Sequence, residues 1–150
     1  MTKPVKTLLM GAIETAIKAL SYVPNADQVK RGQGIPIDQD TAVYPWTCFF
    51  DEPETKKERN RIASKVFELV IQVWVKKGTT GIDEQMDIID ADLEMKLLGD
   101  TEIANACIRI EAKRSEKFNV DDNETGILEA VYELTYAHKW KDPYDPVKGP

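Results

Sequence analysis

One long run of alternating apolar residues constrains the fold of this chain more than any other feature. Residues 61–77 read RIASKVFELVIQVWVKK. The apolar side chains that fall on one side of this run are Phe67, Leu69, Ile71, Val73 and Val75. Period-two alternation rich in β-branched and aromatic residues predicts a strand, because successive side chains leave a pleated backbone on opposite faces. At about 3.3 Å per residue the run is far longer than an average strand, so we expect it at the centre of a sheet.

The flanking segments predict an α+β domain. Residues 5–20 and residues 82–97 each carry apolar side chains at helical spacing, and acidic residues open the second helix, where they suit its dipole. Strands are expected at residues 28–31, 42–50, 61–77, 106–118 and 127–138. The order α-β-β-β-α-β-β predicts a twisted, mostly antiparallel β-sheet with the two helices packed on one face.

Local patterns also give the expected strands an orientation. Pro45 removes a ladder donor, which places the strand at residues 42–50 at an edge of the sheet or beside a bulge. In the strand at residues 106–118, the side chains expected to point inward are Ile108, Ile110 and Ala112. In the strand at residues 127–138, they are Leu128, Ala130, Tyr132, Leu134 and Tyr136.

Length and proline content divide the chain into one domain and a tail. A chain of 150 residues has the usual size of a single domain and can bury a proper core. We predict this domain at residues 1–138. Residues 139–150 read KWKDPYDPVKGP. They hold three prolines and show no periodicity, which predicts an extended tail.

Charge and cysteine content exclude several classes of protein. The net charge of −6 argues against a general nucleic-acid binder, which needs a basic surface to release phosphate counterions. No run approaches eighteen apolar residues, so no membrane span is expected. Glu14 and Lys18 interrupt the apolar start of the chain, which argues against a signal peptide. Cys48 and Cys107 are too few for a disulfide framework, so reduced thiols are expected.

Residues with catalytic or metal-binding chemistry form no convincing constellation. His138 is the sole histidine, and no serine or cysteine motif accompanies it. The two cysteines lack zinc-ligand spacing. Residues 121–126 imitate the start of a calcium loop, but Tyr132 stands where calcium requires a bidentate glutamate. We therefore expect no catalytic, cofactor-binding or metal-binding residues, and no enzyme.

Peripheral segments with aromatic and charged side chains predict a protein interface instead. Residues 51–60, DEPETKKERN, contain no apolar residue other than Pro53 and are expected to form an exposed arm, mobile until assembly orders it. A solvated loop is the alternative. Interfaces favour aromatic side chains and arginine. The candidates for contact with another subunit or another protein are Trp46, Phe49, Phe50, Lys56, Lys57, Arg59, Arg61, Trp140 and Tyr144.

The order of these segments resembles the tail-terminator (tail-completion) proteins of long-tailed bacteriophages. The resemblance covers most of the chain and includes the opening amphipathic helix, the arm that runs into the long alternating strand, and the acidic second helix. Its local motifs are VKRGQGIP at residues 29–36, AVYPW at residues 42–46 and ILEAVYELTYAHKWKDPYDP at residues 127–146. The turn at residues 121–126 and the proline-rich tail have no counterpart that we can place in the family.

The resemblance implies a structural protein of the virion, with no enzymatic activity and no cofactor. It implies a homohexameric ring that caps the tail tube, stops its elongation and presents a surface to the head connector. The implied partners are further copies of the chain, the tail tube protein and the head–tail connector or neck protein, and the implied location is the head-proximal end of the tail after synthesis in the host cytoplasm. DNA would pass through the ring without specific binding, and no membrane is involved. The alternatives are a head-completion or neck protein of the same assembly, and a small α+β ligand-binding module with a cleft under the sheet.

Overall fold

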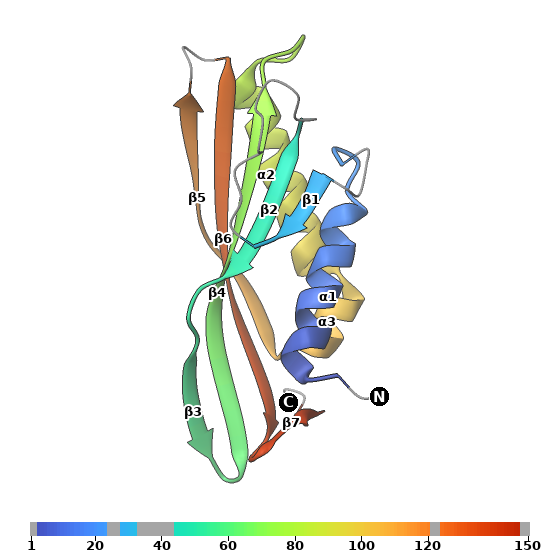
Figure 1. Cartoon of the computed structure of the whole chain (residues 1–150), viewed down its shortest axis with the longest axis vertical. Helices are drawn as coiled ribbons and strands as arrows, with labels where there is room; N and C mark the ends of the chain where they lie inside the picture. Colours follow the sequence, from blue (N-terminus) through green and yellow to red (C-terminus); the bar gives the residue numbers. More distant parts are fainter. Residues whose placement is uncertain (1–2, 24–27, 33–43, 121–123, 148–150) are drawn as a thin grey trace.

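The chain folds into one curved sheet with helices on one of its faces (Figure 1). The computed structural model describes residues 3–23, 28–32, 44–120 and 124–147. In chain order the elements are α1 (Val5–Lys18), β1 (Val29–Arg31), β2 (Trp46–Asp51), β3 (Thr55–Arg59), β4 (Ile62–Lys76), α2 (Ile82–Gly99), α3 (Thr101–Ala106), β5 (Arg109–Val120), β6 (Thr125–Lys139) and β7 (Asp142–Pro146). The sheet is mixed but mostly antiparallel, so the α+β class expected from the sequence is confirmed.

β4 is the centre of the sheet, as its alternation predicts. The main strand order is β1-β2-β4-β6-β5, and β4 runs antiparallel to both of its neighbours. It pairs with β6 over its whole length, from Ile62 opposite Lys139 to Lys76 opposite Thr125. The five side chains predicted on one face of β4 are all buried, which confirms the face as well as the strand.

The hydrophobic core lies between this face of the sheet and the helices. The predicted inward side chains of β6, from Leu128 to Tyr136, are all buried against it. α1 contributes its buried row, which includes Leu9 and Ile13, and α2 contributes another, which includes Met86 and Leu93. Burial of one such side chain stabilises a fold by about 1.5–3 kcal/mol. The helices therefore hold the upper part of the sheet, where they overlie it.

The predicted arm is exposed, as expected, but it forms a strand rather than a loop, and its mobility before assembly stays a prediction. β3 pairs antiparallel with the start of β4, from Thr55 opposite Val66 to Arg59 opposite Ile62. Asn60 and the residue after it have φ values of 53° and 63°, as a two-residue type I′ hairpin turn requires. All side chains of β3 are exposed, so the strand is held by its backbone ladder. The sequence argument considered side-chain burial and overlooked the hydrogen bonds that β4 offers.

The proline-rich tail is extended, as predicted, but it returns to the sheet. β7 pairs antiparallel with the end of β6, with His138 opposite Pro146. Beyond β7, the backbone N–H of Val147 donates to the carbonyl of Ala137 at 3.0 Å. The chain reverses at Trp140 and Lys141, and the latter has a φ of 65°. At this end the sheet therefore has the order β3-β4-β6-β7.

The strand that contains Trp46 is not at an edge, contrary to prediction. β1 pairs with β2 in parallel, from Val29 opposite Thr47 to Arg31 opposite Phe49. Pro45 precedes the first residue of β2, so its missing N–H removes no bond from the ladder. Residues 42–43, which were expected in this strand, lie outside the described residues.

A short third helix, α3, follows α2 and was not predicted. The side chain of Asp100 accepts a hydrogen bond from the backbone N–H of Ile103 at 3.0 Å, which is the N-cap arrangement for a helix. Ile103 is buried beneath this turn. Because α3 occupies residues 101–106, the following strand begins at Arg109 rather than at residue 106.

The inward row expected in this strand is also largely wrong. Ile108 lies before β5 and is exposed, Ala112 is exposed, and only Ile110 packs against the core. β5 is the outer strand of the sheet, and its register with β6 shifts between Ala112 and Arg114. Ile108 and Ala112 precede this shift, so their exposure follows from the outer position of the strand, which leaves its side chains largely uncovered.

Candidate subunit interface

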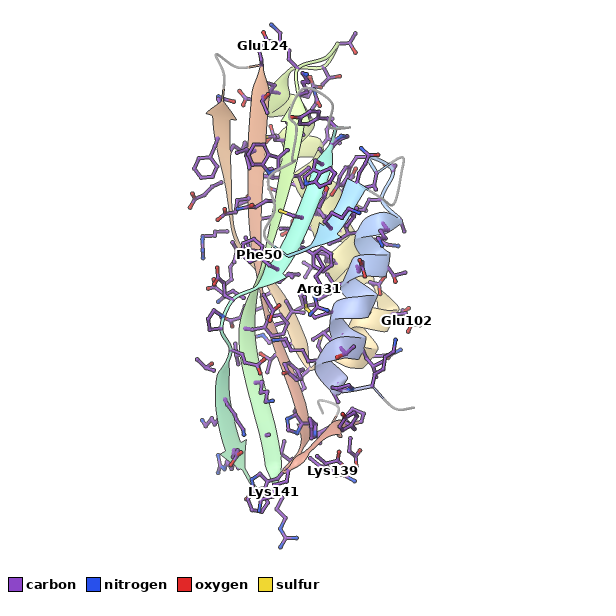
Figure 2. All side chains as sticks on the ribbon, in the orientation of Figure 1. Arg31, Phe50, Glu102, Glu124, Lys139 and Lys141 are labelled. Atoms are coloured by element: carbon purple, nitrogen blue, oxygen red, sulfur yellow. The ribbon has the colours of Figure 1, made fainter. Side chains whose placement is uncertain are left out.

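The lower end of the sheet brings together six of the nine predicted interface residues. Three lie on β3, one lies in the turn that follows it, and two lie after β6; they are Lys56, Lys57, Arg59, Arg61, Trp140 and Tyr144. Figure 2 shows Lys139 and Lys141 at this end and Glu124 at the opposite end. We call residues 55–66 together with residues 138–146 the tip. Figure 1 shows that the tip extends past the lower end of the helices.

Two hydrogen bonds join the halves of the tip. The backbone N–H of Trp140 donates to the carbonyl of Arg61 at 2.7 Å. The indole N–H of Trp140 donates to the carboxylate of Glu58 at 3.2 Å, across 82 positions of the sequence. The ammonium of Lys141 lies 4.3 Å from the centre of the Trp140 ring, within the range of a cation–π contact. The arm and the tail, treated as separate segments in the sequence, are therefore one structural unit.

The tip is positively charged although the chain is acidic. Residues 55–66 hold five lysine or arginine residues and a single glutamate, a net charge of +4 in a chain of net charge −6. Glu58 forms an ion pair with Lys56 at 2.9 Å. Among the described residues Lys57, Arg59 and Arg61 have no ion pair. The tip thus presents uncompensated positive charge to its surroundings.

A half-buried polar cluster connects the tip to the helices, and we call it the joint. The ammonium of Lys6, in α1, lies 2.8 Å from the carboxylate of Asp51 and 2.9 Å from that of Glu54. The hydroxyl of Tyr136 donates to the same Glu54 oxygen at 2.9 Å, and the ammonium of Lys65 lies 3.7 Å from the other oxygen. The joint lies where the chain passes from β2 to β3. It therefore fixes the direction in which β3 leaves the body of the protein.

Hydrogen bonding keeps the members of the joint charged at neutral pH. Partial burial alone would raise the pKa of Glu54, but hydrogen bonds from Lys6 and Tyr136 outweigh burial and lower this pKa below its usual value. Burial also acts to raise the pKa of Asp51, and the hydrogen bond and charge of Lys6 lower it overall. For Lys6 itself, burial lowers the pKa, and the two carboxylates raise it above its usual value.

An aromatic pair supports the joint from below. The rings of Phe67 and Tyr136 meet edge to face with their centres 5.9 Å apart. The ammonium of Lys6 lies 4.3 Å from the centre of the Phe67 ring. These contacts place a positive charge against an aromatic face with two carboxylates beside it. The sequence argument missed the joint, because its members come from α1, the β2–β3 connection, β4 and β6.

The other three predicted interface residues lie on β2, away from the tip. Phe49 is fully buried in the core and offers no surface to a partner. Trp46 and Phe50 point to the opposite face of the sheet, which the helices do not cover. Trp46 stands opposite Trp74, and Phe50 stands opposite Val70, both on β4. Trp74 and Val70 are buried, and Trp46 and Phe50 are half-buried, so this face is apolar but offers little open surface.

The sequence analysis did not include Trp74 among the interface residues, nor its neighbours on this face. Ile127 of β6 stands opposite Trp74, and Phe118 of β5 stands opposite Ile127. With Trp46 they form a row across four adjacent strands. The indole N–H groups of both tryptophans are buried and have no acceptor among the described residues. The signal was present in the sequence as the second face of the long alternation.

Groups with possible catalytic or metal chemistry do not converge among the described residues. His138 is buried, and its Nδ1 lies 2.7 Å from the carbonyl of Lys139, which accepts the hydrogen bond. Cys48 is buried and Cys107 half-buried, and neither forms a disulfide. Within the described ranges no three His, Cys, Asp or Glu side chains are grouped so as to hold a metal ion. The turn that imitates a calcium loop includes residues 121–123, which lie outside the description.

Surface depressions of the described chain are small. One beside the start of α2 has a volume of about 390 Å³, at the low end of the roughly 300–1,000 Å³ typical of ligand pockets, and the one between α2 and β5 has about 270 Å³. Its lining includes Asp90, Glu94 and Arg114. Among the described helices, none has both the length and the apolar character needed to cross a bilayer.

Comparison with known proteins found similarity among solved structures. No family model and no curated protein matches the chain. Among solved structures, the chain is similar to a chain of the virion of the native gene transfer agent (GTA) particle, with a TM-score of 0.46 and 14% sequence identity. The match covers 87% of this chain and 96% of the other. Because the identity and the TM-score are both low, we argue function from the residues of the chain itself.

Proposed function

We propose that this chain is a structural protein of a virion, of the tail-terminator type, and that six copies form a ring. The observation that carries this proposal is the tip, a basic and aromatic extension of the sheet that projects beyond the helices. The resemblance of the ordered sequence segments to tail terminators supplies the identity of the assembly. The geometry of the chain supplies a reason for self-association.

The tip buries too little to be explained by the stability of a single subunit. Ordering a backbone residue costs about 1–2 kcal/mol, and the exposed side chains of β3 offset none of this by burial. Trp140 and Tyr144 remain 43% and 48% exposed. Aromatic side chains with adjacent arginine and lysine are typical of protein interfaces. Contact with another subunit would give these residues the burial that their own chain lacks.

A projecting tip favours contacts between unlike surfaces. Such head-to-tail contacts close into a ring when each subunit is rotated by a constant angle from the last. In the proposed ring one side caps the tail tube and stops its elongation, and the other side presents a surface to the head connector. DNA passes through the centre without specific binding, because subunits of net charge −6 repel phosphates.

Electron microscopy and sedimentation of the purified protein test this proposal. We expect six-fold rings, at high protein concentration or in the presence of tail tubes, and rings at the ends of tubes. A monomer at every concentration that also fails to bind tubes would overturn the proposal. Rings that bind the connector and leave tubes unbound would identify a head-completion or neck protein instead.

A further inference from the structure

The outer side of α2 carries a second row of apolar residues. Its buried row packs on the sheet, and the other row is exposed to solvent, with Ile88 51%, Met95 78% and Leu98 45% exposed. Ala91 is exposed between them. The positions 88, 91, 95 and 98 follow the three-and-four spacing of one helix side. We call these four residues the outer stripe.

A row of this kind differs from the scattered apolar residues of ordinary surfaces. Single exposed apolar side chains are normal, whereas contiguous rows mark interaction sites. Helices that carry such a row commonly bind through it at the i, i+3, i+4 and i+7 positions. Among the described residues, no side-chain hydrogen bond or ion pair involves a member of the outer stripe. α2 thus has one apolar side for its own core and one for a partner.

Negative charge borders the outer stripe. Asp87 forms an ion pair with Lys117 of β5, and Asp90 accepts a hydrogen bond from Ser115 at 2.9 Å. Asp87 is the one acidic residue of α2 with an ion pair among the described residues. Asp83, Glu84 and Glu94 are exposed and have no ion pair there. α2 as a whole holds six acidic residues and one lysine. A partner that matches this surface should therefore combine apolar side chains with positive charge.

The tip has this combination, and it cannot reach the outer stripe of its own subunit. β4 begins at the tip and ends beside the start of α2, and the helix runs back from there with the outer stripe on its side away from the sheet. Figure 1 shows the tip below the helices and the start of α2 at the other end. The only copy of the outer stripe available to the tip is therefore one on a second copy of this chain.

We propose that the tip of one subunit docks on the outer stripe of the next, with the basic side chains of β3 facing the acidic border and Trp140 covering the apolar row. This inference rests on the proposed ring, for which it names the contacting surfaces. Burial of the apolar row supplies affinity, and the opposite charges supply register and a faster association. Each subunit then uses two different surfaces, as a closed head-to-tail ring requires.

Two charge-reversal variants test the contact. The tip variant changes Lys56, Lys57 and Arg59 to glutamate. The stripe variant changes Asp83, Glu84 and Glu94 to lysine. These side chains are exposed, so circular dichroism should match that of the wild type. Thermal unfolding should be unchanged in the tip variant and slightly lowered in the stripe variant, because Asp83 and Glu84 suit the dipole at the start of α2. At physiological salt we expect each variant alone to remain monomeric under conditions in which the wild type forms rings.

The decisive measurement is an equimolar mixture of the two variants. In the mixture an acidic tip meets a basic stripe, and a basic tip meets an acidic stripe, so alternating subunits should assemble into an even-numbered ring. A single chain that carries both sets of changes should also assemble. A matched control, Lys30→Glu with Arg31→Glu and Lys77→Glu, reverses three exposed basic residues outside the tip and should assemble as the wild type does.

The apolar part of the contact has its own test. Met95→Ser should raise the protein concentration needed for ring formation about tenfold, which corresponds to the loss of one well-buried interface side chain. Met95 is the most exposed of the three large side chains of the outer stripe, so the change should leave subunit stability nearly unaltered.

The outcomes separate this inference from the proposed function. Wild-type rings together with normal assembly of either reversal variant would overturn the tip–stripe contact and leave the ring standing. Wild-type rings together with a mixture that stays monomeric would overturn it as well. A wild type that forms no ring and binds no tube would overturn the proposed function, and the contact with it.

Discussion

The two halves of β4 belong to one continuous strand, yet they are held in place by different forces. Residues 69–75 lie between β2 and β6 and contribute mostly buried side chains to the sheet. Residues 62–66 lie between β6 and β3, and every residue of β3 is exposed. Apolar burial dominates the first half, and the backbone ladder, the joint and a few surface contacts dominate the second.

This difference shows how one sheet separates stability from recognition. Buried positions tolerate little change, because each affects the packing of its neighbours. Exposed positions on a ladder tolerate almost any residue that permits a strand, so their side chains are free to match a partner.

The largest effect is expected in the buried half of β4. Ile71→Ala removes a fully buried side chain and leaves a cavity, so it should lower the free energy of unfolding by about 2–5 kcal/mol. Ile62→Ala in the tip half of the same strand should cost less than about 1 kcal/mol, because Ile62 is only half-buried. Denaturant unfolding of both variants measures the difference. Equal costs would show that the two halves are held alike.

The next effect concerns the packing of α2 on β6. A Cβ added at Gly126 would lie 2.4 Å from Cγ2 of Ile82, a separation too short for two carbons. Gly126→Ala should therefore lower the free energy of unfolding by about 1–3 kcal/mol. Gly11→Ala is the matched control, since no atom lies within 4 Å of its added Cβ. In the interior of α1 this control should stabilise the protein by about 0.5–1 kcal/mol.

A smaller effect is expected at the joint between the two regions. Lys6→Met keeps most of the side chain and removes the charge that Asp51 and Glu54 share, so it should cost about 1 kcal/mol. It should also accelerate hydrogen exchange of the β3 amides more than that of the β6 amides. Lys18→Met, which removes an exposed pair with Glu14, should change neither quantity.

The joint also predicts a pH dependence. The pKa values of Asp51 and Glu54 are lower in the folded protein than their usual values of 3.8 and 4.5. Their contribution to stability is therefore complete above the usual values and is lost as the pH falls through the lowered ones. In Lys6→Met the pKa values of Asp51 and Glu54 should lie closer to their usual values. The free energy of unfolding should therefore fall less in this variant than in the wild type as the pH is lowered from 5. An unchanged acid slope would contradict this role for Lys6.

The smallest effect on stability is expected at the tip. Trp140→Ala removes one exposed hydrogen bond to Glu58, so unfolding free energy should change by no more than about 0.5 kcal/mol. The same change should raise the concentration needed for ring formation. A large loss of stability would show that the tip is part of the folded core rather than a surface for a partner.

Sequence reasoning succeeded where one face of a strand is buried. β4 and β6 were both predicted with the correct inward residues, because burial on one side imposes alternation on the sequence. β5 was placed but its face was misjudged. An outer strand with a bulge between Ala112 and Arg114 is under no such constraint, and its residues are mostly exposed.

Sequence reasoning failed where order depends on a partner strand. β3 has no apolar residue, so its strand character comes from its register with β4 and from the turn at Asn60. The candidate interface shows the same limit. Composition identified six residues of the tip, but only the fold brings Trp140 to Glu58. One residue in the sequence could have predicted α3. Asp100 follows Gly99, and aspartate is a typical helix N-cap residue.

The continuous β4–β6 ladder has a mechanical consequence. A force that pulls on the end of β4 along its axis acts in shear on all 15 pairs between Ile62 and Lys76, so the load is shared along the whole subunit. A force that pulls β3 sideways acts on one pair at a time and peels only five. A strained assembly would therefore shed the hairpin strand at low force while the rest of the subunit keeps its shape. Detachment of β3 would thus relieve the load before the β4–β6 ladder is disrupted.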